Sequence, residues 1–486
     1  MKKHLLILGT ITYAIMTIMA VILFEERIAF LDGAFILFSI LSEGELAIQV
    51  YRFGAAVTQA VPLLASWMDF SLESIMKIYS ACFPIYFYSL FLICLLGLKK
   101  EWYAILLLLF NVGIVTHTFY WVIPEFQQGL SLMVVYFAFL EKAMEQKWFS
   151  NSKIWTHSIN TGLICTLAFF HPLMIFPFAF FIGYFFLFSK NSPKNFHWLT
   201  IKNLFKPISP IVQQWQLSLS GSLFLFFFLL KSLVFNNAYD NMSIGGLRNF
   251  KTLFPDYFTI QSNLNFLSYL VVDYYLLIVA LIAIGVYAVT KKKFIWLSFI
   301  LIPFLGYLFL INISYPKGPH QFYIESLYLP LSLILFLPVI YTLSQKLNSK
   351  TVLLALSIIV SIRMVHIYQT HSLYSERVAY VRDFLDKTKN LPNKKLILRP
   401  EQVNDTKLFL DWGLAYEAWL LSTIDKGISR SAVVEYEAGS HQSLLKENKV
   451  FAATWGIYPY ENLSNRYFMF KDSSYYVIPE GDFNFK

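Results

Sequence analysis

Charged residues are scarce in this chain. Only 14% of its 486 residues are Asp, Glu, Lys or Arg, whereas 57% are hydrophobic and the mean hydropathy is +0.54. A soluble protein of this length needs far more charged surface, so the composition excludes that class. Repeated apolar segments of bilayer-spanning length predict an α-helical polytopic membrane protein.

Cysteines and nucleotide-binding motifs are missing from the places where they would carry chemistry. Cys82, Cys94 and Cys165 all fall in apolar segments, which leaves the loops without a disulfide framework or a Cys-based zinc site. The absence of a P-loop or dinucleotide fingerprint argues against nucleotide-consuming chemistry. The net charge of +9 arises from short lysine clusters between apolar segments rather than from a basic stripe, so no nucleic-acid partner is expected.

Apolar segments of roughly 17 to 25 residues, the length that a bilayer requires, recur along residues 1–368. Their ranges are 5–24, 73–98, 101–122, 128–141, 154–171, 172–189, 217–235, 264–290, 294–313, 322–344 and 351–368. Lysines gather in alternate loops, as at Lys99 and Lys100 or at 291–293, which places those loops and the N-terminus in the cytoplasm. The sequence thus predicts about 11 transmembrane helices and an exterior C-terminus.

Two regions outside these spans carry structure of their own. Residues 25–70 form a long first exterior loop with two amphipathic or weakly apolar stretches, which predict helices lying along the membrane surface, with a re-entrant hairpin as the alternative. Residues 369–486 regain charge and alternate helical and strand patterns, so they predict a small exterior α/β domain. Its expected helices are 375–389, 407–425 and 441–448, and its expected strands are 394–400, 431–437, 450–455, 466–470 and 474–480.

Ionisable residues lie near the exterior ends of the predicted spans, which places any chemistry on that face. Asp32, in FLDG, is placed as a general base beside a lipid-facing cavity, or else it is an N-cap or snorkelling surface acid. Glu125, in HTFYWVIPEFQQG, is either a second catalytic acid or a helix N-terminal acid favoured by the dipole. With His171, these two acids could hold a divalent Mg, Mn or Zn ion, although a lone His near an interface is more often a hydrogen-bonded cap.

Basic residues near the same face are candidates for binding a lipid phosphate. These candidates are Lys231, Arg248, Lys317 and His320. Snorkelling explains Lys231 nearly as well, and a solvated Pro and Gly loop explains Lys317. Further pocket candidates are Arg27, Arg52, His117 and Glu325.

The arrangement resembles the GT-C superfamily of membrane glycosyltransferases, which includes protein mannosyltransferases, oligosaccharyltransferases and aminoarabinose transferases. The shared features are an inside N-terminus, a long first exterior loop with an acid at Asp32, a second acid at Glu125, many further spans and a C-terminal exterior α/β domain. The resemblance implies a polyprenyl-phosphate sugar donor, an inverting displacement on the exterior face, and Asp32 as the catalytic acid acting on the acceptor. Many members carry a paired acid motif, whereas FLDG has a single acid and the nearby pair of Glu43 and Glu45 begins eleven residues on.

The predicted function is therefore transfer of a sugar from a polyprenyl-phosphate donor to a glycan, lipid or protein acceptor at a membrane. Usage of Lys, Asn, Ile and Phe is typical of AT-rich bacterial genomes, so the expected location is a bacterial inner membrane with a periplasmic C-terminal domain. A catalytically inactive GT-C-like scaffold that binds an envelope protein stays open as an alternative. A transporter is disfavoured because the spans carry no ionisable residues near their midpoints.

Overall fold

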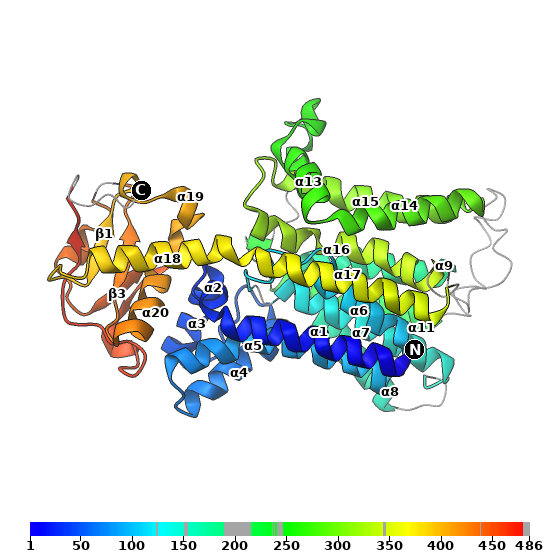
Figure 1. Cartoon of the computed structure of the whole chain (residues 1–486), viewed down its shortest axis with the longest axis horizontal. Helices are drawn as coiled ribbons and strands as arrows, with labels where there is room; N and C mark the ends of the chain where they lie inside the picture. Colours follow the sequence, from blue (N-terminus) through cyan, green and yellow to red (C-terminus); the bar gives the residue numbers. More distant parts are fainter. Residues whose placement is uncertain are drawn as a thin grey trace.

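The computed structural model describes residues 1–122, 125–149, 154–188, 215–235, 237, 239–240, 246–343, 347–437 and 439–479. A helical bundle and a smaller C-terminal domain lie at opposite ends of an elongated molecule (Figure 1). Helices α17 (Ser349–Gln369) and α18 (His371–Lys387) continue one another and run through both parts. The expected domain boundary at residue 369 therefore falls inside a continuous helical segment.

Six helical segments of the described chain are long and apolar enough to cross a membrane, so the chain is a helical membrane protein. They are α1 (Lys2–Ile22), α5 (Leu72–Leu92) with η2 (Ile93–Gly97), α11 (Trp215–Val234), α15 (Phe294–Ser314), α16 (Gln321–Pro338) with η8 (Val339–Leu343), and α17 with α18. The pair α13 (Gln261–Val272) and α14 (Tyr275–Thr290), bent by 84°, makes seven if it counts as one span. The predicted number of eleven is not confirmed by these helices.

The remaining bundle helices are shorter or more polar, and α6, α7 and α9 among them pack against α16. They are α6 (Glu101–Gly113), α7 (Glu125–Glu145), α8 (Ile154–Ala168), η3 (Pro172–Met174) and α9 (Ile175–Phe188). Almost every residue of α16 is buried, as expected of a helix that is apolar on all faces and lies in the core of a bundle.

Two predicted spans differ from the observed helices. The segment 101–122 is helical only as far as Gly113, and the chain beyond it is held in a non-helical course because Glu325 accepts the N–H groups of Thr116 and Thr118. The segment 264–290 is broken near Asp273 rather than straight. In both places a buried side chain supplies hydrogen bonds that a continuous helix would have made.

The first loop contains short helices, as predicted, but they are not all at a surface. It forms α2 (Phe24–Ile28), α3 (Asp32–Glu43), η1 (Phe53–Ala55) and α4 (Ala56–Trp67). Most of α3 is buried, because it packs between α4 and α20 of the C-terminal domain. Helix α3 is therefore largely covered by protein, and its position along a membrane surface stays a prediction.

The C-terminal domain combines a parallel sheet with a hairpin. The sheet has the order β2-β1-β5, formed by β1 (Lys395–Leu398), β2 (Ser431–Val434) and β5 (Tyr476–Val477), while β3 (Val450–Ala453) and β4 (Gly456–Pro459) pair antiparallel. Helix α20 (Leu414–Lys426) packs on β2, and α19 (Asp405–Leu408), η10 (Pro400–Gln402), η11 (Asp411–Gly413), η12 (Gln442–Leu445) and η13 (Tyr460–Asn462) connect the elements.

The structure shows helices with a parallel sheet here, as an α/β domain requires, with local differences from the predicted elements. The expected helix 407–425 is interrupted, because α19 ends at Leu408 and α20 begins at Leu414. The expected helix 441–448 is only the short η12, and the expected strand 466–470 makes a single bridge from Phe470 to Ser429. Strand β4 was not predicted, because its hydrophobic pattern continues that of β3 across a tight turn. The alternation of apolar residues identified the buried strands but not the exposed hairpin strand.

Candidate functional site

Asp32 begins α3 at the end of the bundle that faces the C-terminal domain. The preceding residue, Leu31, has φ 41° and ψ −113°, a conformation that non-glycine residues rarely adopt. Trp121 Nε1 donates a hydrogen bond of 2.8 Å to Asp32 Oδ2. Asp32 remains partly exposed, so another molecule can reach its carboxylate.

The surroundings of Asp32 raise its pKa to about 6, mainly because burial disfavours the charged form. The Trp121 hydrogen bond opposes this effect, whereas the negative charge of Glu125 adds to it. A carboxyl group with this pKa is ionised at neutral pH yet basic enough to take a proton from an acceptor. Asp32 is therefore suited to general base catalysis.

A chain of alternating charges lies beside Asp32. Arg52 Nη1 is 3.5 Å from Glu125 Oε2, and Arg52 Nη2 is 2.7 Å from Asp240 Oδ1. Lys231 Nζ lies 3.5 Å from Asp240 Oδ2, which is longer than a good hydrogen bond. We refer to Asp32, Trp121, Arg52, Glu125, Asp240 and Lys231 as the Asp32 cluster.

Two N–H donors on the cations of this cluster have no hydrogen-bond partner. Arg52 Nε and Lys231 Nζ are buried and make no hydrogen bond within the described part of the chain. Buried N–H groups without partners cost free energy unless an acceptor is bound there. The pair of cations therefore indicates a place for an anionic ligand such as a phosphate.

An apolar groove approaches this cluster from within the bundle. Its cavity volume is 810 Å³, and it lies between α9, α11, α15 and α16. Its lining residues are Ile175, Phe176, Ala179, Phe180, Gly183, Phe228, Phe299, Pro303, Gly306, Tyr307, Leu310 and Ile334. Phe228 lies one helical turn before Lys231 on α11, so one face of this helix joins the groove to the cluster.

His171 lies close to the cluster, but its ring does not fit a metal ligand. Its Nδ1 accepts a hydrogen bond from the N–H of Leu173, and its ring stacks on Phe126 with centroids 4.4 Å apart. Burial, together with the charges of Arg52 and Lys231, lowers its pKa well below the usual value. No group of three or more His, Cys, Asp or Glu in the described residues is arranged to hold a metal ion.

Three of the predicted pocket residues instead hold the backbone in place. Arg27 donates to Ser80 Oγ at 2.8 Å and to the carbonyls of Ser80 and Phe119. Glu325 accepts hydrogen bonds from the 116–118 segment, and His117 Nδ1 shares one of 3.0 Å with the hydroxyl of Tyr374. These contacts assign structural positions to Arg27, Glu325 and His117.

The other predicted phosphate ligands lie outside the cluster. Arg248, in η6 (Gly246–Phe250), and Lys317 are exposed. His320 stacks on Phe322 with centroids 5.6 Å apart and rings almost parallel. The structure therefore brings together Asp32, Glu125, Arg52 and Lys231 from the predicted set, with His171 beside them.

Sequence reasoning missed Asp240 and Trp121. Asp240 lies in the loop after α11, and nothing in its local sequence separates it from any other loop acid. Trp121 lies four residues before Glu125, and this closeness in sequence could have indicated that Trp121 belongs to the same site.

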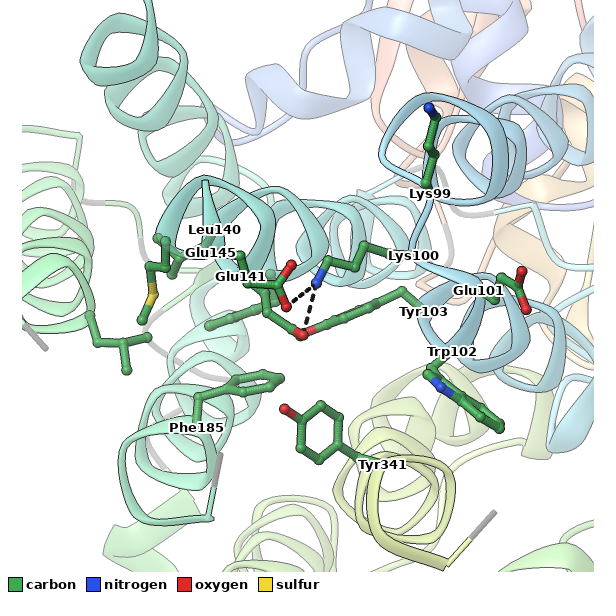
Figure 2. A pocket seen from close by; sticks show the side chains of 13 residues that line it. Lys99, Lys100, Glu101, Trp102, Tyr103, Leu140, Glu141, Glu145, Phe185 and Tyr341 are labelled. Atoms are coloured by element: carbon green, nitrogen blue, oxygen red, sulfur yellow. Dashed lines mark hydrogen bonds and ion pairs between the residues drawn. The ribbon is translucent and has the colours of Figure 1, made fainter. Parts of the chain in front are cut away.

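A second charged cavity lies at the opposite end of the bundle, between α6, α7 and η8 (Figure 2). Lys100 Nζ is 2.9 Å from Glu141 Oε1 and 2.7 Å from Glu145 Oε1, and the Tyr103 hydroxyl donates to Glu141 at 2.6 Å. Because these charges pair with one another, the 390 Å³ cavity does not present the open donors found near Asp32.

The Asp32 cluster thus combines a partly exposed base, two ion-paired cations that each keep an N–H donor without a hydrogen bond, and an apolar groove nearby. These features are compatible with transfer chemistry on a lipid-linked anion. Comparison of the chain with protein-family models, with curated proteins and with solved structures finds no match.

Proposed function

We propose that this protein is an integral-membrane glycosyltransferase that uses a polyprenyl-phosphate sugar as donor. The observation that carries the proposal is the pair of open, buried cationic donors, Arg52 Nε and Lys231 Nζ, between a basic carboxylate and an apolar groove. A polyprenyl chain fits the groove, and its phosphate fits the two cations. This division of polar and apolar surface matches a lipid phosphate better than a free nucleotide.

The transfer step follows from the chemistry of these groups. Asp32 accepts the proton of an acceptor hydroxyl, whose oxygen forms a bond to the anomeric carbon of the donor sugar. The bond from that carbon to the phosphate oxygen breaks, and the electron pair leaves with the polyprenyl phosphate. Arg52 and Lys231 stabilise the negative charge that develops on this leaving group. Attack opposite the departing phosphate inverts the anomeric configuration.

Glu125 orients the site rather than reacting in this scheme. Its ion pair with Arg52, together with that of Asp240, fixes the guanidinium in one position. Its charge also contributes to the raised pKa of Asp32. The scheme assigns no step to a metal ion, because Arg52 and Lys231 supply the positive charge that the departing phosphate requires.

In this proposal the chain crosses a bacterial inner membrane eleven times, with the C-terminal domain in the periplasm. The shorter or more polar helices α6, α7, α8 and α9 then serve as spans alongside the six long segments and the bent α13–α14 pair. The Asp32 cluster faces the periplasm, where polyprenyl-phosphate sugars are consumed without nucleotides.

The experiment compares wild type, Asp32→Asn and Glu45→Gln after reconstitution with polyprenyl-phosphate sugars and membrane glycolipid acceptors. Glu45 is an exposed acid of the same loop and serves as the matched control. Loss of a general base is expected to slow transfer about 100-fold or more for Asp32→Asn, with no change for Glu45→Gln. Mass spectrometry of the lipid fraction measures donor consumed and product formed.

Full transfer activity in a correctly inserted Asp32→Asn protein would remove Asp32 from the mechanism. If deletion of 370–486 abolishes the cellular function while Asp32→Asn leaves it intact and no lipid-linked sugar changes, the inactive scaffold is the better assignment.

A further inference from the structure

A small cavity in the C-terminal domain lies where β2 ends, beside η11 and the β3-β4 turn. Its volume is 170 Å³, and its lining residues are Asp411, Trp412, Ala415, Ala432, Val433, Val434, Tyr436, His441 and Thr454. β1 and β2 are parallel, so the cavity lies at the carboxyl end of a parallel sheet. Ligands of α/β domains commonly bind at this edge.

Three aromatic side chains lie in or beside this cavity. Trp412 and Tyr436 line it, and Tyr436 is 68% exposed. Trp455 does not line the cavity but contacts Trp412, with ring centroids 5.9 Å apart and a tilt of 60°, and it is 62% exposed. Large aromatic groups gathered at a solvent-facing cavity indicate a binding surface. The faces of their rings attract the C–H groups on the flat face of a pyranose.

Polar groups at the same rim match the hydroxyls of a sugar. Asp411 Oδ2 accepts a hydrogen bond of 2.7 Å from the Tyr436 hydroxyl, and Thr454 Oγ1 donates to the Trp412 carbonyl at 3.1 Å. Asp411 Oδ1 and the ring of His441 provide further hydrogen-bonding atoms at the cavity. Each of these groups can pair with a hydroxyl without requiring a charged ligand.

The charges near the cavity select against acidic sugars. Asp411 lines it, and Glu435 lies directly behind, where it accepts the N–H of His441 at 3.0 Å. Among the described residues, the cavity lining includes no lysine or arginine. A uronate or a phosphorylated sugar would therefore meet like charge without a compensating cation.

The cavity is connected to the segment that presents Asp32. Trp412 contacts Phe35 of α3, with ring centroids 6.5 Å apart. The next residue, Gly413, lies so close to Leu31 that a Cβ there would be 2.9 Å from the Leu31 side chain. The element that carries Asp411 and Trp412 thus abuts the residue that precedes Asp32.

We propose that this cavity binds a neutral pyranose unit of the acceptor glycan, with Trp412 and Trp455 contacting its face and Asp411 its hydroxyls. The assignment of the bound glycan as the acceptor rests on the proposed function. The binding of a saccharide in this cavity does not depend on that function. The site holds the acceptor chain at one point while another of its sugars reaches Asp32.

The test is direct binding of neutral oligosaccharides to the full-length protein in lipid nanodiscs. The probes are α-glucan, β-glucan and mannan fragments, with an oligogalacturonate as the acidic control, followed by saturation-transfer difference NMR and titration. At least one neutral fragment is expected to bind, and Trp455→Ala is expected to weaken it about tenfold. Trp67→Ala is the matched control, because Trp67 is 63% exposed but lies on α4.

Absence of binding by all three neutral fragments, or equal binding by Trp455→Ala, would overturn the proposal, as would tighter binding of the acidic fragment. Asp411→Asn is a second variant that keeps the shape of the cavity and is expected to weaken binding. The catalytically impaired Asp32→Asn protein is expected to bind the saccharide as wild type does. Binding without transfer would contradict the proposed function alone, and transfer without binding would contradict this inference alone.

Discussion

Glu417 of the C-terminal domain accepts, through Oε1, the backbone N–H of Leu31 at 2.9 Å. Leu31 precedes Asp32 and has a positive φ, a conformation that costs free energy and persists only where surrounding contacts hold it. Arg377 donates to both carboxylate oxygens of Glu417, at 3.0 and 2.7 Å, and both side chains are almost fully buried. The C-terminal domain therefore fixes the backbone that presents Asp32.

Substitution of Glu417 by Gln is expected to destabilise the protein and to impair transfer. The variant leaves the buried Arg377 without a countercharge, which costs about 3–5 kcal/mol in comparable cases. The melting temperature in detergent measures this loss. The transfer rate of the fraction that remains folded at low temperature measures the effect on Asp32.

The matched control for this prediction is Asp386→Asn, which removes an exposed ion pair with Lys426 in the same domain. It is expected to leave both measurements unchanged, because exposed pairs contribute little. A Glu417→Gln protein with wild-type melting and wild-type transfer would show that the contact to Leu31 is dispensable.

The transfer rate is expected to depend on the ionisation of Asp32. Burial raises its pKa to about 6, so the base is protonated and inactive below that pH. The rate should rise with pH through an apparent pKa near 6 and then level off. A pH–rate profile between pH 4.5 and 8.5 measures this, with Glu45→Gln expected to give the same curve as wild type. A rate that is already almost level from pH 4.5 upwards, as the ordinary aspartate pKa of 3.8 would give, would contradict the role of burial.

The same raised pKa predicts that Asp32 destabilises the folded protein at neutral pH. The folded state binds the proton more tightly than the unfolded state, so stability falls as pH rises from 3.8 through about 6. Asn cannot ionise and can still accept the Trp121 hydrogen bond. Asp32→Asn is therefore expected to be more stable than wild type by about 1–2 kcal/mol at pH 8, allowing for the partial exposure of Asp32.

Thermal unfolding of both proteins at pH 4 and pH 8 checks this prediction. The advantage of Asp32→Asn should shrink at pH 4, where Asp32 is mostly protonated in the folded state. An advantage that does not change with pH would have a different origin from the ionisation of Asp32.

The sequence allowed prediction of the membrane class and of the α/β nature of the C-terminal domain, and it pointed to Asp32 and Glu125, which the structure places in one cluster. The first two predictions rest on hydrophobic patterns, because the length of an apolar segment and the alternation of apolar and polar residues can be read from neighbouring positions in the chain. The partners of Asp32 could not be predicted in this way. Trp121 and Glu125 follow it by about ninety residues, and Asp240 reaches Arg52 only through the folded bundle.

The same distinction explains why some predicted site residues lie outside the Asp32 cluster. Arg27 and Glu325 were candidates because intramembrane charges are costly and often functional. In the structure, backbone groups satisfy them, through Phe119 and Ser80 for Arg27 and through Thr116 and Thr118 for Glu325. A sequence shows that a buried charge needs partners but does not show whether the protein itself supplies them.

Arg52→Lys tests whether the Asp32 cluster binds the donor phosphate. Lysine keeps the positive charge between Glu125 and Asp240, but it cannot span both acids and still direct a further N–H toward a phosphate. The KM for the polyprenyl-phosphate donor is expected to rise about tenfold, which corresponds to the loss of one charge-assisted hydrogen bond. Because Asp32 remains in place, the apparent pKa of the pH–rate profile should change little.

Steady-state kinetics with varied donor concentration, repeated across pH, measure both quantities. The control is Arg248→Lys, a change at an exposed arginine. If Arg248→Lys raises the donor KM and Arg52→Lys does not, the phosphate binds at the η6 loop rather than in the Asp32 cluster, and the groove beside Lys231 loses its proposed occupant.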